Sequence, residues 1–235
     1  MHAADGQPGA IDFEVEPGRV EVGTFFQGRP IRIHGRVAAG CDVVVAITGG
    51  NVEETYNRKG RVGPLWATVG KVTISEVPAL HLVATSAPLS TILPRPVIDA
   101  HMADLDALGR RARILPDSGD RDLVVAEYLA LKRGQGLVGL SEGAVRLEGT
   151  PGNPRFDATL RWPATAPIGT YRVVVWQVRG QVITDEQTVA LEAAYVGLPR
   201  LIAHLAVERS LAYGVVSVVI AVGVGFAMGL VFKKG

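Results

Sequence analysis

The chain has 235 residues, a formal net charge of +1 and a hydrophobic content of 48%. The near-neutral charge disfavours a nucleic-acid-binding protein, and the single cysteine excludes an intramolecular disulfide framework and a cysteine-rich zinc or iron–sulfur site. The mean hydropathy of +0.24 is high for a soluble domain, because an uncharged run, Leu211 to Phe232, follows a body with 22 basic and 23 acidic residues. This composition predicts a globular body attached to a lipid bilayer.

Short apolar stretches between turn residues occupy residues 11–86, a pattern typical of an antiparallel β-sandwich. The expected strands are Asp12–Val15, Arg19–Val22, Ile31–Val37, Val43–Thr48, Lys71–Ser75 and His81–Thr85. In the third strand, apolar residues alternate with Arg32 and His34, which predicts one solvated face. The run Val43–Ile47 is apolar throughout, so we expect a central strand covered on both faces. Cys41 directly precedes this run and is expected to be buried.

The stretch Asn57–Trp66 combines positive charge with glycine, proline and tryptophan, and it is predicted to be a loop. The candidate partner-contact residues in it are Arg58, Lys59, Arg61 and Trp66. Their basic side chains suit lipid head groups or an acidic partner, although such charges ordinarily lie on a solvated surface. The indole either anchors the loop on the sandwich or is an exposed contact.

Between Pro94 and Gly136 the apolar spacing changes to three and four residues, which predicts a helical hairpin inserted into the β-fold. One apolar stripe of its second helix consists of Leu123, Val124, Tyr128 and Leu131. Ser118 is expected to cap this helix and Gly134 to end it. Strands are expected again at Val145–Glu148, Arg155–Trp162, Gly169–Val178 and Val182–Leu191. A tight turn at Gly180 joins the last two.

Two enzyme motifs occur as strings, but neither has the structural context that its chemistry needs. Gly134, Gly136 and Gly139 spell GxGxxG after a helix and before a strand, the reverse of the order in a dinucleotide site. Gly139, Ser141 and Gly143 spell the GxSxG of a nucleophile elbow, but a strand pattern follows where a helix is required. The five histidines are scattered, with no two at the spacing of a metal-binding pair. We therefore expect no catalytic, cofactor-binding or metal-binding residues, and no cofactor.

The uncharged run 211–232 would form a helix of about 33 Å, which matches a hydrocarbon core of about 30 Å. An amphipathic juxtamembrane helix over residues 198–210 is expected to lead into it. Small residues recur at every fourth position and share one face, where a partner helix can approach closely, although such residues are also simply common in membrane helices. These candidate helix-packing residues are Ser217, Ala221, Gly225 and Gly229. Lys233 and Lys234 favour a cytoplasmic C-terminus and an external body.

Five segments, taken in order, resemble a bacterial transmembrane protein family first noted in alphaproteobacteria. They are VGTFFQGRPIRIHG, GCDVVVAITG, RKGRVGPLWATVGKVTISEVP, PATAPIGTYRVVV and a Pro-Arg-led helix that enters a glycine-rich C-terminal span. The resemblance implies a periplasmic body, exported by a cleaved signal peptide and held in the bacterial inner membrane by one helix. The start MHAADGQPGAIDF lacks the signal-peptide pattern, so the residues alone leave a cytosolic tail-anchored protein open. The family brings no catalytic residue, and its occurrence beside a sulfite-exporter-like permease implies a role in transport or in a complex.

Together these patterns predict a mainly β protein: an antiparallel β-sandwich-like body with an inserted helical hairpin, followed by a single C-terminal transmembrane helix. The expected division is 1–94 and 136–197 for the body, 95–135 for the hairpin, 198–210 for the juxtamembrane helix and 211–232 for the transmembrane helix. We expect a non-enzymatic accessory or scaffold subunit that has an integral membrane protein as its partner. The alternative is a periplasmic ligand- or ion-binding module serving a sulfite-exporter-like permease.

Overall fold

The structure, a computed structural model, describes residues 11–116, 120–150 and 153–197, together with 218, 221–225 and 228. This described part is mainly β and its sheets are largely antiparallel, as the sequence predicts. The chain divides into two compact units, Met1–Val20 with Gln27–Ala193 and Glu21–Phe26 with Ala194–Gly235.

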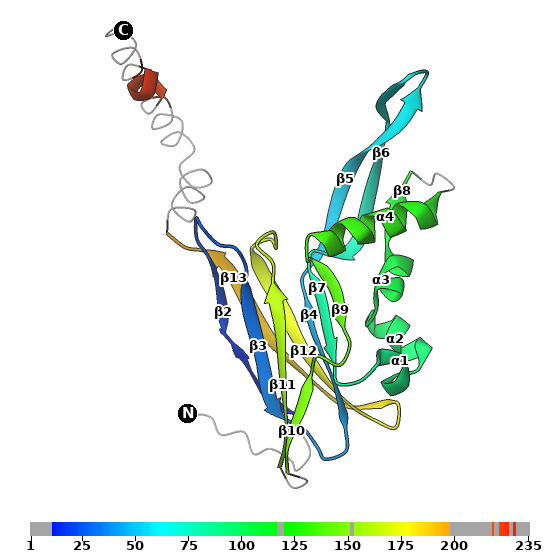
Figure 1. The fold of residues 1–235 in the computed structure, drawn as a ribbon, viewed down its shortest axis with the longest axis vertical. Coiled ribbons are helices and arrows are strands. Elements are labelled where there is room, and N and C mark those ends of the chain that lie inside the picture. The colour runs from blue at the N-terminus through cyan, green and yellow to red at the C-terminus, as the bar shows by residue number, and fades with distance from the viewer. Residues whose placement is uncertain are drawn as a thin grey trace. The chain divides into compact units, whose positions relative to one another are not determined.

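Three sheets and the four helices α1 to α4 make up the described residues up to 197, and a described helical stretch at 221–225 follows (Figure 1). The four-stranded sheet has the order β1 (Asp12–Glu16), β3 (Arg29–Arg36), β11 (Asn153–Trp162) and β10 (Arg146–Thr150). The six-stranded sheet has the order β2 (Arg19–Val22), β13 (Val182–Tyr195), β12 (Gly169–Arg179), β4 (Asp42–Thr48), β7 (His81–Thr85) and β9 (Val138–Ser141). The three-stranded sheet has the order β5 (Asn51–Val62), β6 (Leu65–Pro78) and β8 (Arg113–Leu115). The helices are α1 (Leu89–Ile92), α2 (Arg95–His101), α3 (Leu105–Arg111) and α4 (Arg121–Gly134).

The four-stranded and six-stranded sheets face each other and bury apolar side chains between them, as a sandwich requires (Figure 1). On β3, Ile31 and Ile33 are fully buried while Arg32 between them is exposed, which confirms the predicted solvated face. Across the sandwich, the rings of Trp162 on β11 and Tyr171 on β12 meet edge to face with centroids 4.5 Å apart. Full burial of an aliphatic side chain such as Ile31 or Ile33 stabilises the fold by about 1.5–3 kcal/mol.

The predicted central strand is confirmed as β4, which lies between β12 and β7 and is buried from Val43 to Ile47. Alternate side chains of a strand point to opposite faces, so both faces of β4 must be covered. One is covered by the other sheet, and the second by α1 and α2, through Leu89, Ile92 and Ile98. Cys41, just before the strand, is buried as expected.

The prediction of a loop over residues 57–66 is wrong. Strands β5 and β6 form one long antiparallel hairpin there, with the pair Val62 and Leu65 closing a turn at Gly63, whose φ is +63°. Figure 1 shows the hairpin extending past α4. Its outer half is held by strand pairing and buries little apolar surface, so the alternation that marks a half-buried strand is missing from its sequence.

Between β7 and β9 the described residues form four helices and the short strand β8, in place of the predicted pair of helices. The first predicted helix breaks at Met102, where a left-handed φ of +53° ends α2. Asp104 then caps α3, accepting a hydrogen bond from the Ala107 N–H at 2.7 Å. Strand β8 pairs with Thr73–Ser75 of β6, because the edge of the hairpin offers free backbone groups to the chain that follows α3.

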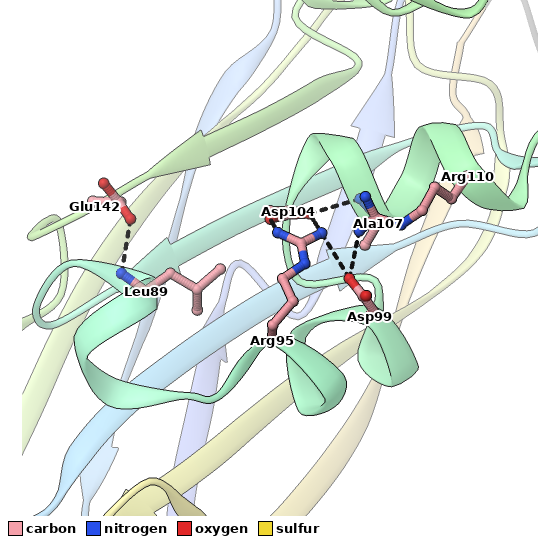
Figure 2. A network of polar contacts seen from close by, with 7 residues as sticks. All are labelled: Leu89, Arg95, Asp99, Asp104, Ala107, Arg110 and Glu142. Carbon is pink, nitrogen blue, oxygen red and sulfur yellow. Dashed lines mark hydrogen bonds and ion pairs between the residues drawn. The ribbon is translucent and has the colours of Figure 1, made fainter. Parts of the chain in front are cut away.

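A network of exposed charges joins α2 to α3 (Figure 2). The Arg95 guanidinium donates to Asp104 at 2.6 Å and pairs with Asp99 at 2.6 Å, and Arg110 of α3 also pairs with Asp99. Exposed pairs of this kind each contribute about 0–1 kcal/mol, so the network adds little to the stability of the fold.

A buried histidine links β7 to the end of α2. His81 is 3% exposed, and its Nε2 lies 2.8 Å from the Met102 carbonyl while its Nδ1 lies 3.0 Å from the Thr48 hydroxyl. Because a carbonyl only accepts, Nε2 carries the proton and Nδ1 accepts from Thr48. Burial lowers the pKa of His81 below its ordinary value of 6.5, against the opposing effect of the hydrogen bond to Met102.

We expect His81 to make the fold less stable in mild acid. A histidine whose pKa is lowered by folding contributes stability above the unfolded-state pKa of about 6.5, and this contribution falls by up to about 1.4 kcal/mol per pH unit below it. Urea unfolding of the native chain and of His81→Gln between about pH 7 and pH 5 should therefore give a steeper loss of stability for the native chain. Equal slopes for the two proteins would contradict the assignment.

The C-terminal predictions fall mostly on residues that the structure leaves undescribed. Among the residues it does describe, no helix combines the length and apolar character needed to cross a membrane. The predicted juxtamembrane helix at 198–210 and most of the predicted span at 211–232 lie outside the described residues. Ser217 and Gly229 lie outside them too, whereas Ala221 and Gly225 lie in a described helical stretch and are exposed.

Candidate functional site

Helix α4 exposes part of the apolar stripe that its sequence predicts. The helix ends at Gly134 as expected, while the predicted cap Ser118 lies outside the described residues. Tyr128 is buried, but Leu123 is 59% exposed and Leu131 is 44% exposed. Two large apolar side chains two helical turns apart thus remain in contact with solvent on one face of α4.

A groove of about 550 Å³ runs between this face and the β5–β6 hairpin. Its α4 wall includes Leu123 and Leu131, and its floor includes Val72 and Ile74 of β6. Arg58 and Lys59 of β5 lie on the hairpin side of the groove. Asp120 and Glu127 on the α4 side also line the groove, so it is a largely apolar trough with charged groups of both signs at its edges.

A buried polar cluster fixes the position of α4 against the hairpin. The Glu54 carboxylate on β5 accepts hydrogen bonds from Tyr56 at 2.9 Å and Tyr128 at 3.0 Å, and it pairs with Lys132 Nζ at 2.6 Å. Glu54 and Tyr56 lie two residues apart on β5 and therefore share one face of the strand. Tyr128 and Lys132 lie four residues apart on α4 and share one face of the helix, so the two elements each contribute two of the four side chains. The Lys132 ammonium also lies 5.4 Å from the Tyr128 ring centroid.

The protonation states in this cluster are set by burial and by the Lys132 charge. Burial alone would raise the pKa of the Glu54 carboxyl, but the hydrogen bonds from Lys132, Tyr56 and Tyr128 and the charge of Lys132 together lower that pKa below 4.5. Burial and the bond to Glu54 raise the pKa of Tyr56 to about 12, and burial with the Glu54 charge also raises the pKa of Tyr128. Glu54 is therefore an ionised acceptor and both tyrosines are neutral donors near pH 7, so the hydrogen bonds between β5 and α4 are formed at that pH.

The predicted contact residues lie on the hairpin beyond this cluster. Arg58 pairs with Asp120 at the start of α4 at 2.6 Å, so it spans the groove. Lys59 donates to the Thr68 hydroxyl at 2.9 Å and Arg61 to the Gly63 carbonyl at 3.2 Å. Neither of these two cations forms an ion pair within the described residues. The Trp66 side chain lies outside what the structure describes, and the backbone of that residue pairs with Arg61.

The two enzyme-like strings lie in the order of elements that the sequence predicts. In GxGxxG, Gly134 is the last residue of α4 and Gly139 lies in β9, so the helix precedes the strand. In GxSxG, Ser141 ends β9, and a turn and β10 follow where an elbow requires a helix. Glu142 within this string accepts a hydrogen bond from the Leu89 N–H at 2.7 Å, so its carboxylate caps α1 (Figure 2).

The sequence pattern reveals neither the Glu54 cluster nor the groove. The signal for the cluster is the spacing of its residues: Tyr128 and Lys132 lie four apart on a helix, and Glu54 and Tyr56 lie two apart on a strand. That strand, β5, was not predicted from the sequence. The groove needs the hairpin, and the hairpin was predicted to be a loop. Its basic edge, Arg58 with Lys59, was the part that the sequence did single out.

The chain was compared with protein families, curated proteins and solved structures. The profile of a family described as "Putative transmembrane protein (Alph_Pro_TM)" matches residues 10–234, which is nearly the whole chain. No curated protein and no solved structure is significantly similar to it.

Proposed function

The chain belongs to this Alph_Pro_TM family of transmembrane proteins, and from that premise we propose that it is a non-enzymatic accessory subunit of a bacterial membrane protein complex. In this proposal the inner membrane holds the chain through the single helix at 211–232, the body lies in the periplasm, and an integral membrane protein is the partner. The helix face formed by Ser217, Ala221, Gly225 and Gly229 would pack against a partner helix in the bilayer.

The observation that carries the proposal is the exposed apolar wall of α4. Leu123 and Leu131 belong to a stripe that a self-contained domain would cover, yet both remain exposed beside a groove with apolar walls. Exposed apolar surface bordered by charged residues is typical of protein-binding sites. We therefore infer that the groove receives an apolar segment of the membrane partner, with an acidic residue of that segment placed against Lys59 at the edge of the groove.

Positive charge introduced into the apolar wall should abolish binding of the partner. The double variant Leu123→Arg with Leu131→Arg buries two unpaired charges in the interface, so we expect the amount of co-purified partner to fall at least about tenfold. The measurement is purification of the full chain from its native host in mild detergent, with quantification of the co-purified integral membrane protein.

The matched control is Leu147→Arg with Val182→Arg, because these residues are similarly exposed but lie on β10 and at the start of β13. This control should retain the partner at the native level. Retention of the partner by the α4 variant would refute the groove as the docking site. Loss of the partner from both variants would show that added charge alone, and not the groove, controls binding.

A further inference from the structure

The outward face of the four-stranded sheet brings one histidine and two carboxylates together. Glu14 and Glu16 lie two residues apart on β1, so their side chains share a face. The antiparallel register places His34 of β3 directly opposite Glu14, and Arg32 opposite Glu16. Directly opposed residues of an antiparallel pair point to the same side of the sheet. The three potential ligands therefore converge from two neighbouring strands.

Arg32 lies opposite Glu16, but its ion pair is with Asp157 of β11. Arg32 donates to the Asp157 carboxylate on β11 at 2.6 Å, and this pair satisfies both side chains. Within the described residues, neither Glu14 nor Glu16 pairs with a lysine or an arginine. The contact that Glu16 makes is with His34, whose Nε2 lies 3.9 Å from the Glu16 carboxylate oxygen. Two carboxylates thus lie beside one imidazole.

We propose that Glu14, Glu16 and His34 bind one divalent transition-metal cation, with Zn²⁺ as the best-fitting ion. One ligand atom from each residue lies within 4.8 Å of the other two. Zinc binds carboxylate oxygen and imidazole nitrogen at about 2.0–2.2 Å, which sets tetrahedral ligand atoms about 3.4 Å apart. The ligand atoms therefore have to approach one another on metal binding. Rotation about the side-chain bonds of the two exposed glutamates achieves this with the β1–β3 backbone unchanged.

The ligand types select the class of metal. Imidazole suits zinc, copper, nickel and iron, whereas calcium and magnesium require oxygen ligands and gain nothing from His34. A hollow of about 390 Å³ opens on the same sheet, with Glu14 and His34 in its lining. It leaves space for a fourth ligand from solvent or from a small molecule. This arrangement is an open site with three protein ligands. It would suit a role of the protein as an ion-binding module, and it does not depend on docking of a membrane partner.

The histidine spacing in the sequence does not reveal this site, because the ligands come from two strands about twenty residues apart. The site exists only when β1 pairs with β3 in the observed register. A shift of one residue would turn the glutamates to the buried face.

Zinc titration of the full-length chain tests the proposal. The untagged protein in detergent is stripped with a chelator, and Zn²⁺ binding is measured by competition with a chromophoric chelator. We expect one equivalent of Zn²⁺ per chain that excess Mg²⁺ or Ca²⁺ does not displace. Because even indirect loss of ligand support costs about 10–100-fold in affinity, His34→Gln and Glu14→Gln should each weaken binding at least about tenfold.

Glu148→Gln is the matched control, because Glu148 lines the same hollow but is not one of the three ligands. It should bind Zn²⁺ with native affinity. Glu14→Gln replaces an exposed side chain by one of the same shape, so its fold is expected to be native, and metal-free unfolding curves check this. Absence of a stoichiometric Zn²⁺ site in the native chain would overturn the proposal. Native affinity in both ligand variants would overturn it as well.

Discussion

Replacement of Lys132 by alanine is expected to lower the free energy of unfolding by about 3 kcal/mol. The Lys132 side chain is 6% exposed and neutralises Glu54, whose side chain is 30% exposed. Removal of one member of a buried pair leaves an uncompensated charge, and the partial exposure of Glu54 keeps the loss at the lower end of the usual range. Urea unfolding of the full chain in detergent, followed by tryptophan fluorescence, measures the change.

The double variant Lys132→Met with Glu54→Gln is the control for this prediction. It removes both charges and keeps side chains of similar volume, so it should be clearly more stable than Lys132→Ala. A loss below about 0.5 kcal/mol for Lys132→Ala would show that the pair does not hold α4 against the hairpin.

The same cluster sets a dependence on acid. The pKa of Glu54 is lowered in the folded state, so its contribution to stability is fully present above the unfolded-state value of about 4.5 and is lost as the pH falls through the lower folded-state value. The native chain should therefore lose more stability than Glu54→Gln between about pH 6 and pH 3. A loss of equal size in the two proteins would contradict the lowered pKa.

The second large effect is expected for Gly35→Ala in β3. A Cβ at this position would lie 2.1 Å from the Asp12 carbonyl oxygen and 2.7 Å from the Phe13 Cα, both on the neighbouring strand β1. Because the obstacle is backbone, β1 must move away from β3, and we expect a loss of about 3 kcal/mol. Thermal unfolding of the full chain measures it, and a Tm within error of the native value would contradict the close approach.

Gly18→Ala is the matched control for Gly35→Ala. Gly18 lies between β1 and β2, and no atom lies within 4 Å of the position that its Cβ would occupy. Alanine there reduces the freedom of the unfolded chain and should be neutral or stabilising by about 0.4–1 kcal/mol. Destabilisation of equal size at both positions would mean that the effect at Gly35 does not come from steric conflict with β1.

Most of the sandwich could be predicted from sequence because its strands have a buried side that the residue pattern records. The uniformly apolar Val43–Ile47 correctly indicated a strand covered on both faces, and the alternation around Arg32 indicated one covered on a single face. The β5–β6 hairpin could not be predicted in this way, because backbone pairing and not side-chain burial holds its outer half together. The break at Met102 depends on a single left-handed residue, which periodicity does not register.

The candidate sites were harder to predict than the fold because each is assembled from separate elements. The basic residues Arg58 and Lys59 were identified from sequence, but the sequence pattern does not show that the apolar stripe of α4 lies opposite them. Leu123 and Leu131 fit the period of a buried helix face, and only the position of α4 against the hairpin shows that they are exposed. The register of β1 and β3, which joins Glu14 to His34, is likewise a property of the folded sheet.

The most direct test of partner docking is site-specific photo-cross-linking in living cells of the native host. A photoreactive amino acid is placed at Leu123 in the α4 groove, or at Leu147 on β10 as a reference that is also exposed. The proposal predicts a cross-linked integral membrane protein from position 123 and none from position 147. Absence of an adduct at position 123 in a normally expressed chain, or the same adduct from both positions, would contradict it.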